Sequence, residues 1–296
     1  MVQPPGGDVA VVIPARNESD RIAATVRAAA GLAGVDLVVV VDDGSDDGTA
    51  AIGQAAGASV MRHARGRGKA AAMETGAEAV RLIEAGQDRA RPRYLLFLDG
   101  DLAQTAAEAG PLAAPVRAGQ ADMTIAVFRD RVKQGGHGFV VTLSGSGIMR
   151  ATGWRPAQPL NGQRCLTRAA FEAARPLAPG FGAETGLTID LLRQGMRIKE
   201  VEVPLAHRAT GGDWRSQVHR ARQFADVARA LAIVPNSPVN HFWHGYAERH
   251  FEHATVTNSR CGSWWRENND GSPDKGYFYC EATPSGDVRH QFIVIS

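Results

Sequence analysis

Apolar runs of strand length alternate with segments of helical length through the first third of the chain. The runs are Val9–Pro14, Leu37–Val41, Ala58–Met61 and Tyr94–Leu98. Because nearly every position in them is apolar, they are typical of strands that are buried on both faces of a sheet. The intervening Ala-rich segments predict helices ending near Ala33, Ala56 and Ala85, with residues 17–20 capping the first. This alternation predicts an α/β fold with a mostly parallel central sheet flanked by helices.

The middle of the chain is less regular. Gly135–Gly138 and Ser144–Gly147 flank an apolar stretch, and their glycines favour turns around a loop or a fraying helix. The pattern then predicts helices at 169–174 and 186–195, a half-exposed strand at Ile198–Pro204 and an amphipathic helix at Val218–Ile233.

The composition changes after about Val234, becoming rich in His, Trp, Asn, Gly and Ser. We therefore predict a main domain over residues 1–235 and a C-terminal extension over residues 236–296. Tyr277–Cys280 and Gln291–Ile295 predict strands of a small β appendage, and a poorly ordered extension is the alternative. The extension's histidines lack cysteine or carboxylate partners at metal-ligand spacing, so no zinc site is predicted there.

Polar clusters follow the predicted strands where each one ends. Asp99 and Asp101 follow one strand, Asp42 and Asp43 follow another, and Lys69 opens a helix after a third. Ligands of parallel sheets bind beyond the carboxyl ends of the strands, so a site is predicted at this edge. Two carboxylates two residues apart point to the same side of an extended chain and suit Mg²⁺ or Mn²⁺ with a phosphate-bearing ligand. An ordinary Asp-Gly-Asp turn is the alternative.

Composition and charge narrow the class of protein. The net charge of +2 over 296 residues argues against bulk attraction to nucleic acid. A local basic cluster of Arg62, Arg65, Arg67 and Lys69 is interpreted either as a solvated loop or as an anion site. The three cysteines lack metal-type spacing, and neither a signal peptide nor an apolar run of membrane-spanning length is found, so we expect a cytoplasmic protein without a transmembrane segment.

Taken together, four segments resemble the GT-A glycosyltransferases, especially those of family 2. These segments are Pro14–Glu18, Val41–Ser45, Gly68-Lys69 and Asp99–Asp101, and the resemblance extends over residues 8 to about 234. Ala178–Gly186 and Ala206–Arg208 look like the corresponding stretches of the glucosyl-3-phosphoglycerate synthases, which are soluble enzymes using a nucleotide-diphospho-sugar. The polyprenyl-phosphate sugar synthases of family 2 are similar over the first 130 residues or so.

The resemblance implies a nucleoside pocket at the end of the first two strands. Pro14, Ala15 and Glu18 would line it, with Glu18 accepting hydrogen bonds from ribose hydroxyls. Asp42 or Asp43 would accept a hydrogen bond from the base. The alternatives are helix-terminal charge for Glu18 and turn or cap chemistry for the two aspartates.

The resemblance also implies a diphosphate and metal site. Gly68 would allow close backbone approach, and Lys69 would neutralise a phosphate or contact the base. Asp101 and His207 would bind Mg²⁺ or Mn²⁺, with Asp99 touching the ribose or a metal-bound water. Surface or structural roles for Lys69 and His207 are the alternatives.

Three further positions are implied near the reacting groups. Arg208 would add charge stabilisation at the leaving diphosphate. Glu184 would serve as general base in an inverting enzyme, or would position donor or acceptor in a retaining one. Thr185 in place of a second acid favours the retaining-like interpretation. Asn161–Arg164 is expected near the acceptor.

The expected function is therefore metal-dependent hexose transfer from a nucleotide-diphospho-sugar to a small hydroxyl or phosphate acceptor, which includes lipid phosphates. UDP-glucose is the first expectation for the donor and GDP-mannose the second. A homodimer is one expectation for the assembly. The alternatives are a sugar nucleotidyltransferase, although Pro14–Asn17 lacks the glycines of that chemistry, and a non-catalytic nucleotide-sugar-binding protein.

Overall fold

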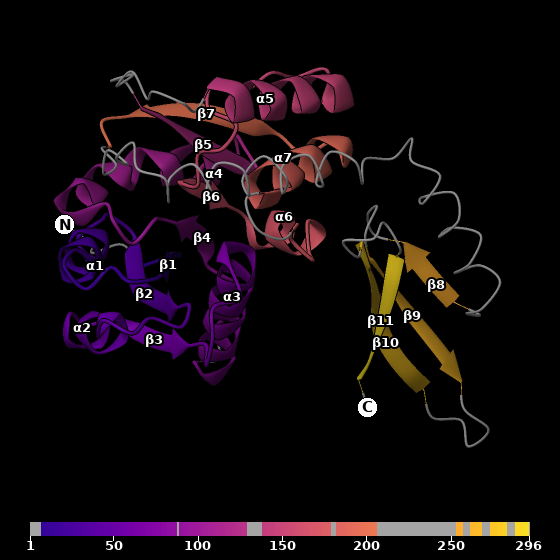
Figure 1. Cartoon of the computed structure of the whole chain (residues 1–296), viewed down its shortest axis with the longest axis horizontal. Coiled ribbons are helices and arrows are strands. Elements are labelled where there is room, and N and C mark those ends of the chain that lie inside the picture. The colour runs from indigo at the N-terminus through magenta and orange to yellow at the C-terminus, as the bar shows by residue number, and fades with distance from the viewer. Residues whose placement is uncertain are drawn as a thin grey trace.

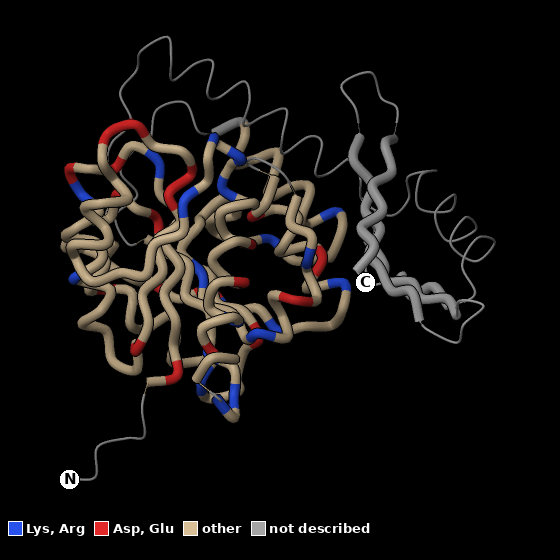
Figure 2. The backbone as a smooth tube through the Cα atoms, turned by 90° about the horizontal axis from the view of Figure 1, so that it is seen from below, with Lys and Arg blue, Asp and Glu red and all other residues tan. Residues whose placement is uncertain are grey.

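The computed structural model describes residues 7–87, 89–128, 138–178 and 182–205, together with the backbone of four strands between residues 253 and 295. In the described residues from 7 to 205, helices lie on both sides of a seven-stranded sheet (Figure 1). Basic and acidic residues are interspersed along these residues (Figure 2).

The sheet has the strand order β3-β2-β1-β4-β6-β5-β7. Its strands are β1 Val9–Ala15, β2 Val35–Asp42, β3 Ser59–Arg62, β4 Tyr94–Phe97, β5 Met123–Phe128, β6 Arg164–Leu166 and β7 Ile198–Val203. All pairings are parallel except those of β6, which runs antiparallel to both β4 and β5. The prediction of a mostly parallel sheet flanked by helices is confirmed.

Seven α-helices and one 3-10 helix accompany these strands in the described chain. They are α1 Ile22–Ala30, α2 Thr49–Ala55, α3 Lys69–Gly86, η1 Ala103–Leu112, α4 Ala113–Arg117, α5 Gly138–Thr152, α6 Arg168–Ala173 and α7 Ala183–Arg193. Alternate residues of β1 point to opposite faces, as the strand period requires. Val11 and Ile13 join a core with α1 and η1, whereas Ala10 and Val12 join a core with α3, α6 and α7.

One local prediction is wrong: the N-cap of α1 is Arg21, after residues 17–20, and Arg21 makes no side-chain capping hydrogen bond. The second stretch, Gly138 to Thr152, is one helix that includes Ser144–Gly147, as the helical alternative predicted, and does not form the turns that its glycines favoured. It has Val140, Ser144 and Ile148 buried on one face at a helical spacing of four residues, and this packing outweighs the low helix propensity of glycine.

The C-terminal strands form a separate antiparallel sheet of order β11-β10-β9-β8. The strands are β8 His253–Val256, β9 Cys261–Glu267, β10 Pro273–Ala282 and β11 Val288–Ile295. Both segments predicted as strands lie within β10 and β11. The division at residue 235 stays a prediction, and the predicted helix Val218–Ile233 lies outside the described residues.

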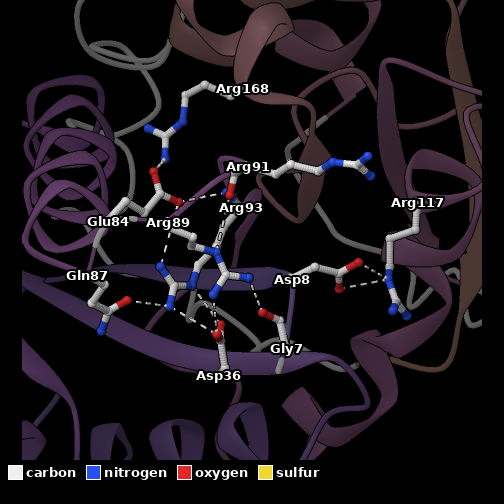
Figure 3. Close-up of polar contacts among 10 residues, drawn as sticks. All are labelled: Gly7, Asp8, Asp36, Glu84, Gln87, Arg89, Arg91, Arg93, Arg117 and Arg168. Carbon is white, nitrogen blue, oxygen red and sulfur yellow. Dashed lines mark hydrogen bonds and ion pairs between the residues drawn. The ribbon is translucent and has the colours of Figure 1, made fainter. Parts of the chain in front are cut away.

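An ion-pair network with Glu84 and Arg93 buried lies at the end of the sheet where β4 begins (Figure 3). The Glu84 carboxylate accepts the Arg93 backbone N–H at 2.7 Å and pairs with Arg168 Nη2 at 3.1 Å. The Arg93 guanidinium in turn pairs with Asp36 at 2.7 Å, and Arg89 pairs with the same carboxylate at 3.0 Å. The network therefore ties α3 to β2, α6 and the start of β4.

Glu84→Ala is expected to lower the free energy of unfolding by about 3 kcal/mol, because it leaves Arg168 without its carboxylate and the buried Arg93 backbone N–H without its acceptor. The matched control is Glu78→Ala on the same helix. Glu78 pairs with Arg81 at an exposed position, and its loss is expected to cost less than about 1 kcal/mol. Urea denaturation followed by circular dichroism measures both. Equal losses in the two variants would contradict a structural role for the network.

Candidate functional site

The carboxyl ends of β2, β1 and β4 lie next to one another. Ala15 at the end of β1 is opposite Asp42 at the end of β2. Phe97, the last residue of β4, lies two residues before Asp99. The predicted carboxylates of these neighbouring parallel strands therefore lie together at the carboxyl ends of the strands, where ligands of such sheets bind.

The two aspartates at the end of β2 have different environments. Asp42 is buried, and its Oδ1 accepts the backbone N–H of Ser45 at 3.0 Å. Its buried Oδ2 has no hydrogen-bond partner in the described chain, although Arg62 Nε lies within ion-pair distance at 3.2 Å. In contrast, Asp43 accepts the backbone N–H groups of Arg67 at 2.7 Å and Gly68 at 2.8 Å. Of the two, Asp42 has the oxygen available for a ligand.

Asp43 fixes the loop that precedes α3. Burial works to raise the pKa of its carboxyl, but the hydrogen bonds from Arg67, His63 and Gly68 outweigh it and lower the pKa from its ordinary value. Gly68 has φ of +92°, a backbone conformation that side chains disfavour. The loop therefore depends on an ionised carboxylate for its shape.

Because the folded state lowers the pKa of Asp43, its contribution to stability is present above the unfolded-state pKa and is lost as the pH falls through the folded-state pKa. Asp43→Asn should therefore destabilise the protein at about pH 6, and the difference from wild type should shrink toward about pH 3. Urea denaturation at each pH measures this difference. Asp46→Asn, at an exposed position in the same segment, is the control. A difference independent of pH would exclude the ionised carboxylate as the cause.

Lys69, the first residue of α3, links two carboxylates from distant parts of the chain. Its Nζ lies 2.6 Å from Asp99 Oδ1 and 3.1 Å from Glu184 Oε1. Burial would lower the pKa of Lys69, but attraction to Asp99 and Glu184 outweighs it and raises the pKa. Glu184, in the first turn of α7, is 5% exposed. The ammonium group is therefore a fixed positive charge between Asp99 and Glu184.

Gln163 holds Asp99 from the other side. Its side-chain carbonyl accepts the Asp99 backbone N–H at 2.8 Å, and its Nε2 donates to Asp99 Oδ2 at 2.7 Å. A side chain at Gly162 would clash with the Lys69 ammonium group. The structure brings both residues against the Asp99–Lys69 pair, and nothing in the sequence indicated these contacts. The placement of residues 161–164 near the acceptor stays a prediction.

The turn that carries Asp101 is anchored to α1. Thr25 Oγ1 donates to the Gly100 carbonyl at 2.9 Å and accepts the Ala103 backbone N–H at 2.8 Å. Arg21 Nη1 donates to the Asp101 carbonyl at 3.2 Å. A Cβ at Gly100 would lie 3.3 Å from Glu18 Cγ, so Glu18 adjoins the same turn. Thr25 is a further residue that the sequence analysis did not identify.

The structure thus brings most of the predicted site residues to one edge. Those at the strand ends and at the start of α3 are Pro14, Ala15, Glu18, Asp42, Asp43, Gly68, Lys69, Asp99 and Asp101. Glu184 joins them through Lys69. His207 and Arg208 lie outside the described residues. Within the described ranges, no three His, Cys, Asp or Glu side chains form a ready metal site.

The family model of glycosyl transferase family 2 matches residues 10–172, more than half of the chain. The chain therefore belongs to glycosyl transferase family 2. This match and the sheet confirm the predicted GT-A fold and the resemblance on which it rested.

The relatives agree with this classification. Glycosyltransferase AglJ of Haloferax volcanii is 30% identical over 212 residues, which cover 69% of this chain and 65% of AglJ. The glucosyl-3-phosphoglycerate synthase of Mycolicibacterium paratuberculosis is 28% identical over 202 residues, covering 62% of this chain and 60% of that enzyme. The chain thus spans less than two thirds of the length of either curated relative.

A solved structure shows the same likeness. It is a Mycobacterium tuberculosis glucosyl-3-phosphoglycerate synthase in complex with Mn²⁺, UDP-glucose and phosphoglyceric acid. The TM-score is 0.59 at 26% identity, over 79% of this chain and 83% of that one. Among the helices of the described chain, none combines the length and apolarity that crossing a membrane requires.

Proposed function

We propose that this chain transfers a hexose from a nucleoside-diphospho-sugar to a small hydroxyl or phosphate acceptor, lipid phosphates included. The observation that carries the proposal is the meeting of Asp99 with Lys69 and Glu184 beside the Asp101 turn. A fixed cation among carboxylates suits a ligand that combines a diphosphate with sugar hydroxyls. UDP-glucose is the favoured donor because the resembling synthase binds it, and GDP-mannose is the second.

The nucleoside would bind at the ends of β1 and β2. Asp42 Oδ2 is buried and has the Arg62 guanidinium at 3.2 Å but no hydrogen-bond partner in the described chain, and it is the acceptor we assign to a base N–H. A ligand N–H there would gain a charge-assisted hydrogen bond. Pro14 and Ala15 would form the wall of this pocket, and Glu18 would face the ribose.

Mg²⁺ or Mn²⁺ fits the chemistry of the carboxylates at the end of β4. We assign Asp101 as the direct ligand, as the family resemblance implies, and Asp99, which contacts Lys69 and Gln163, as its neighbour. His207 is the proposed second protein ligand, and donor phosphates would complete the oxygen-rich set that these cations prefer. When bound, the cation stabilises negative charge on the departing diphosphate. Lys69 and Arg208 would add positive charge at the same group.

Glu184 is proposed to position the reacting sugar or the acceptor. Its carboxylate pairs with the Lys69 ammonium at 3.1 Å, and carboxylate oxygens accept hydrogen bonds from hydroxyl groups. The retaining-like role, which Thr185 in place of a second acid also favours, is the one we propose.

The decisive experiment measures nucleoside diphosphate release from a panel of UDP- and GDP-sugars with 3-phosphoglycerate, glycerol phosphate or polyprenyl phosphate as acceptor. It is run with Mn²⁺, with Mg²⁺ and with EDTA. Metal-dependent release that requires one acceptor is expected. Release of pyrophosphate from a sugar phosphate and a nucleoside triphosphate would instead establish a nucleotidyltransferase. Tight donor binding without turnover on any acceptor would identify a binding protein.

A further inference from the structure

His63, directly after β3, is a buried imidazole to which the proposed function gives no role. It is 7% exposed, and both ring nitrogens have partners. Nδ1 lies 2.6 Å from Asp43 Oδ1, and Nε2 lies 3.0 Å from Thr75 Oγ1 on α3. The ring therefore bridges the end of β2 and the second turn of α3.

The partners of His63 fix which nitrogen carries the proton in the neutral ring. An ionised carboxylate only accepts hydrogen bonds, so Nδ1 must donate to Asp43. Nε2 then accepts from the Thr75 hydroxyl. Asp43 also receives two backbone N–H groups, and its lowered pKa agrees with an ionised acceptor.

From Asp43, an unbroken series of contacts leads to the centre of the site. Its oxygens hold the backbone N–H groups of Arg67 and Gly68, and the next residue is Lys69. Lys69 in turn pairs with Asp99 and Glu184. If the Asp43 carboxylate rotates away, the left-handed Gly68 loses the bond that holds it, and the start of α3 shifts.

We propose that His63 is a positioning residue: through Asp43 it fixes the loop at residues 66–68, and thereby places Lys69 for the diphosphate of the donor. The inference rests on the proposed function for the identity of the ligand. The dependence of the loop on His63 is independent of that function.

The test compares His63→Ala with His63→Asn. The Asn side chain keeps an N–H donor near the place of Nδ1 and so preserves the bond to Asp43, whereas Ala removes it. His63→Ala is expected to raise the Kd for UDP, or for GDP if that is the nucleotide bound, about tenfold, the value of one charge-assisted hydrogen bond. His63→Asn is expected to restore most of the affinity. In turnover assays the effect of Ala should appear in KM more than in kcat.

Two controls separate positioning from loss of stability. Glu84→Ala destabilises the far edge of the sheet and should leave the Kd for nucleotide unchanged. Thr75→Val removes only the Nε2 partner and should have a smaller effect on the Kd than His63→Ala. Wild-type affinity in a folded His63→Ala variant would overturn the proposal while leaving the proposed function intact.

Amide hydrogen exchange provides a readout that needs no ligand. Exchange at the Arg67 and Gly68 amides should become at least about tenfold faster in His63→Ala and return toward wild type in His63→Asn. If the wild-type protein binds neither UDP nor GDP, the proposed function fails, and this exchange still decides the structural part. Unchanged exchange at both amides in His63→Ala would overturn it.

Discussion

Asp101→Asn is expected to lower the rate of nucleoside diphosphate release by more than about a hundredfold while leaving the fold intact. The amide keeps the shape of the side chain but removes the negative charge that a divalent cation requires. The turn itself is held by the backbone, through Thr25 and Arg21, and these bonds do not involve the Asp101 carboxylate. These backbone bonds remain in Asp101→Asn, so the fold should stay intact.

Mn²⁺ binding, followed by electron paramagnetic resonance in the presence of UDP, separates the metal role from other causes of inactivity. Asp101→Asn should weaken Mn²⁺ binding in parallel with turnover. Asp122→Asn, whose carboxylate pairs with Arg197 at an exposed position, is the control and should retain both. Full turnover in Asp101→Asn would show that the metal ligand lies elsewhere.

The part of the fold that the sequence predicted well is the part with continuous apolar strands. β1, β2 and β4 are buried on both faces, and their residues pack into two separate cores. β5 and β6 were not predicted, and β6 illustrates why. It has three residues and begins with Arg164, whose buried guanidinium donates to the carbonyl groups of Asn161, Pro159 and Glu184. An arginine buried by tertiary contacts carries no strand signal in the sequence.

The candidate site was likewise predicted only in part from the sequence. The aspartates and Lys69 could be placed from strand ends alone, because neighbouring parallel strands end at one edge. The sequence left Asp42 and Asp43 equivalent, since only tertiary contacts show that Asp43 is occupied by the loop before α3. The partners of Lys69 were equally hidden, because Glu184 arrives on a helix far along the chain. The residue types therefore predicted the kind of chemistry at the site, and long-range contacts distinguished the individual residues.

Lys69→Met is expected to raise the Kd for the nucleotide about a hundredfold and to destabilise the protein by about 2 kcal/mol. The affinity falls because the proposed contact between the Lys69 cation and the diphosphate is lost. The stability falls because two carboxylates that shared one ammonium group then repel each other in a largely enclosed site. Lys199→Met, at an exposed position on β7, is the matched control and should change neither quantity.

A double-mutant cycle separates these two effects. Glu184→Gln removes one of the repelling charges, so Lys69→Met should cost clearly less stability in the Glu184→Gln background than in wild type. The loss of nucleotide affinity should persist in that background, because the missing cation is not replaced. Urea denaturation gives the stabilities and calorimetric titration with UDP gives the affinities. Additive losses of stability would mean that Lys69 and Glu184 are not energetically coupled, and would remove Glu184 from the site that Lys69 organises.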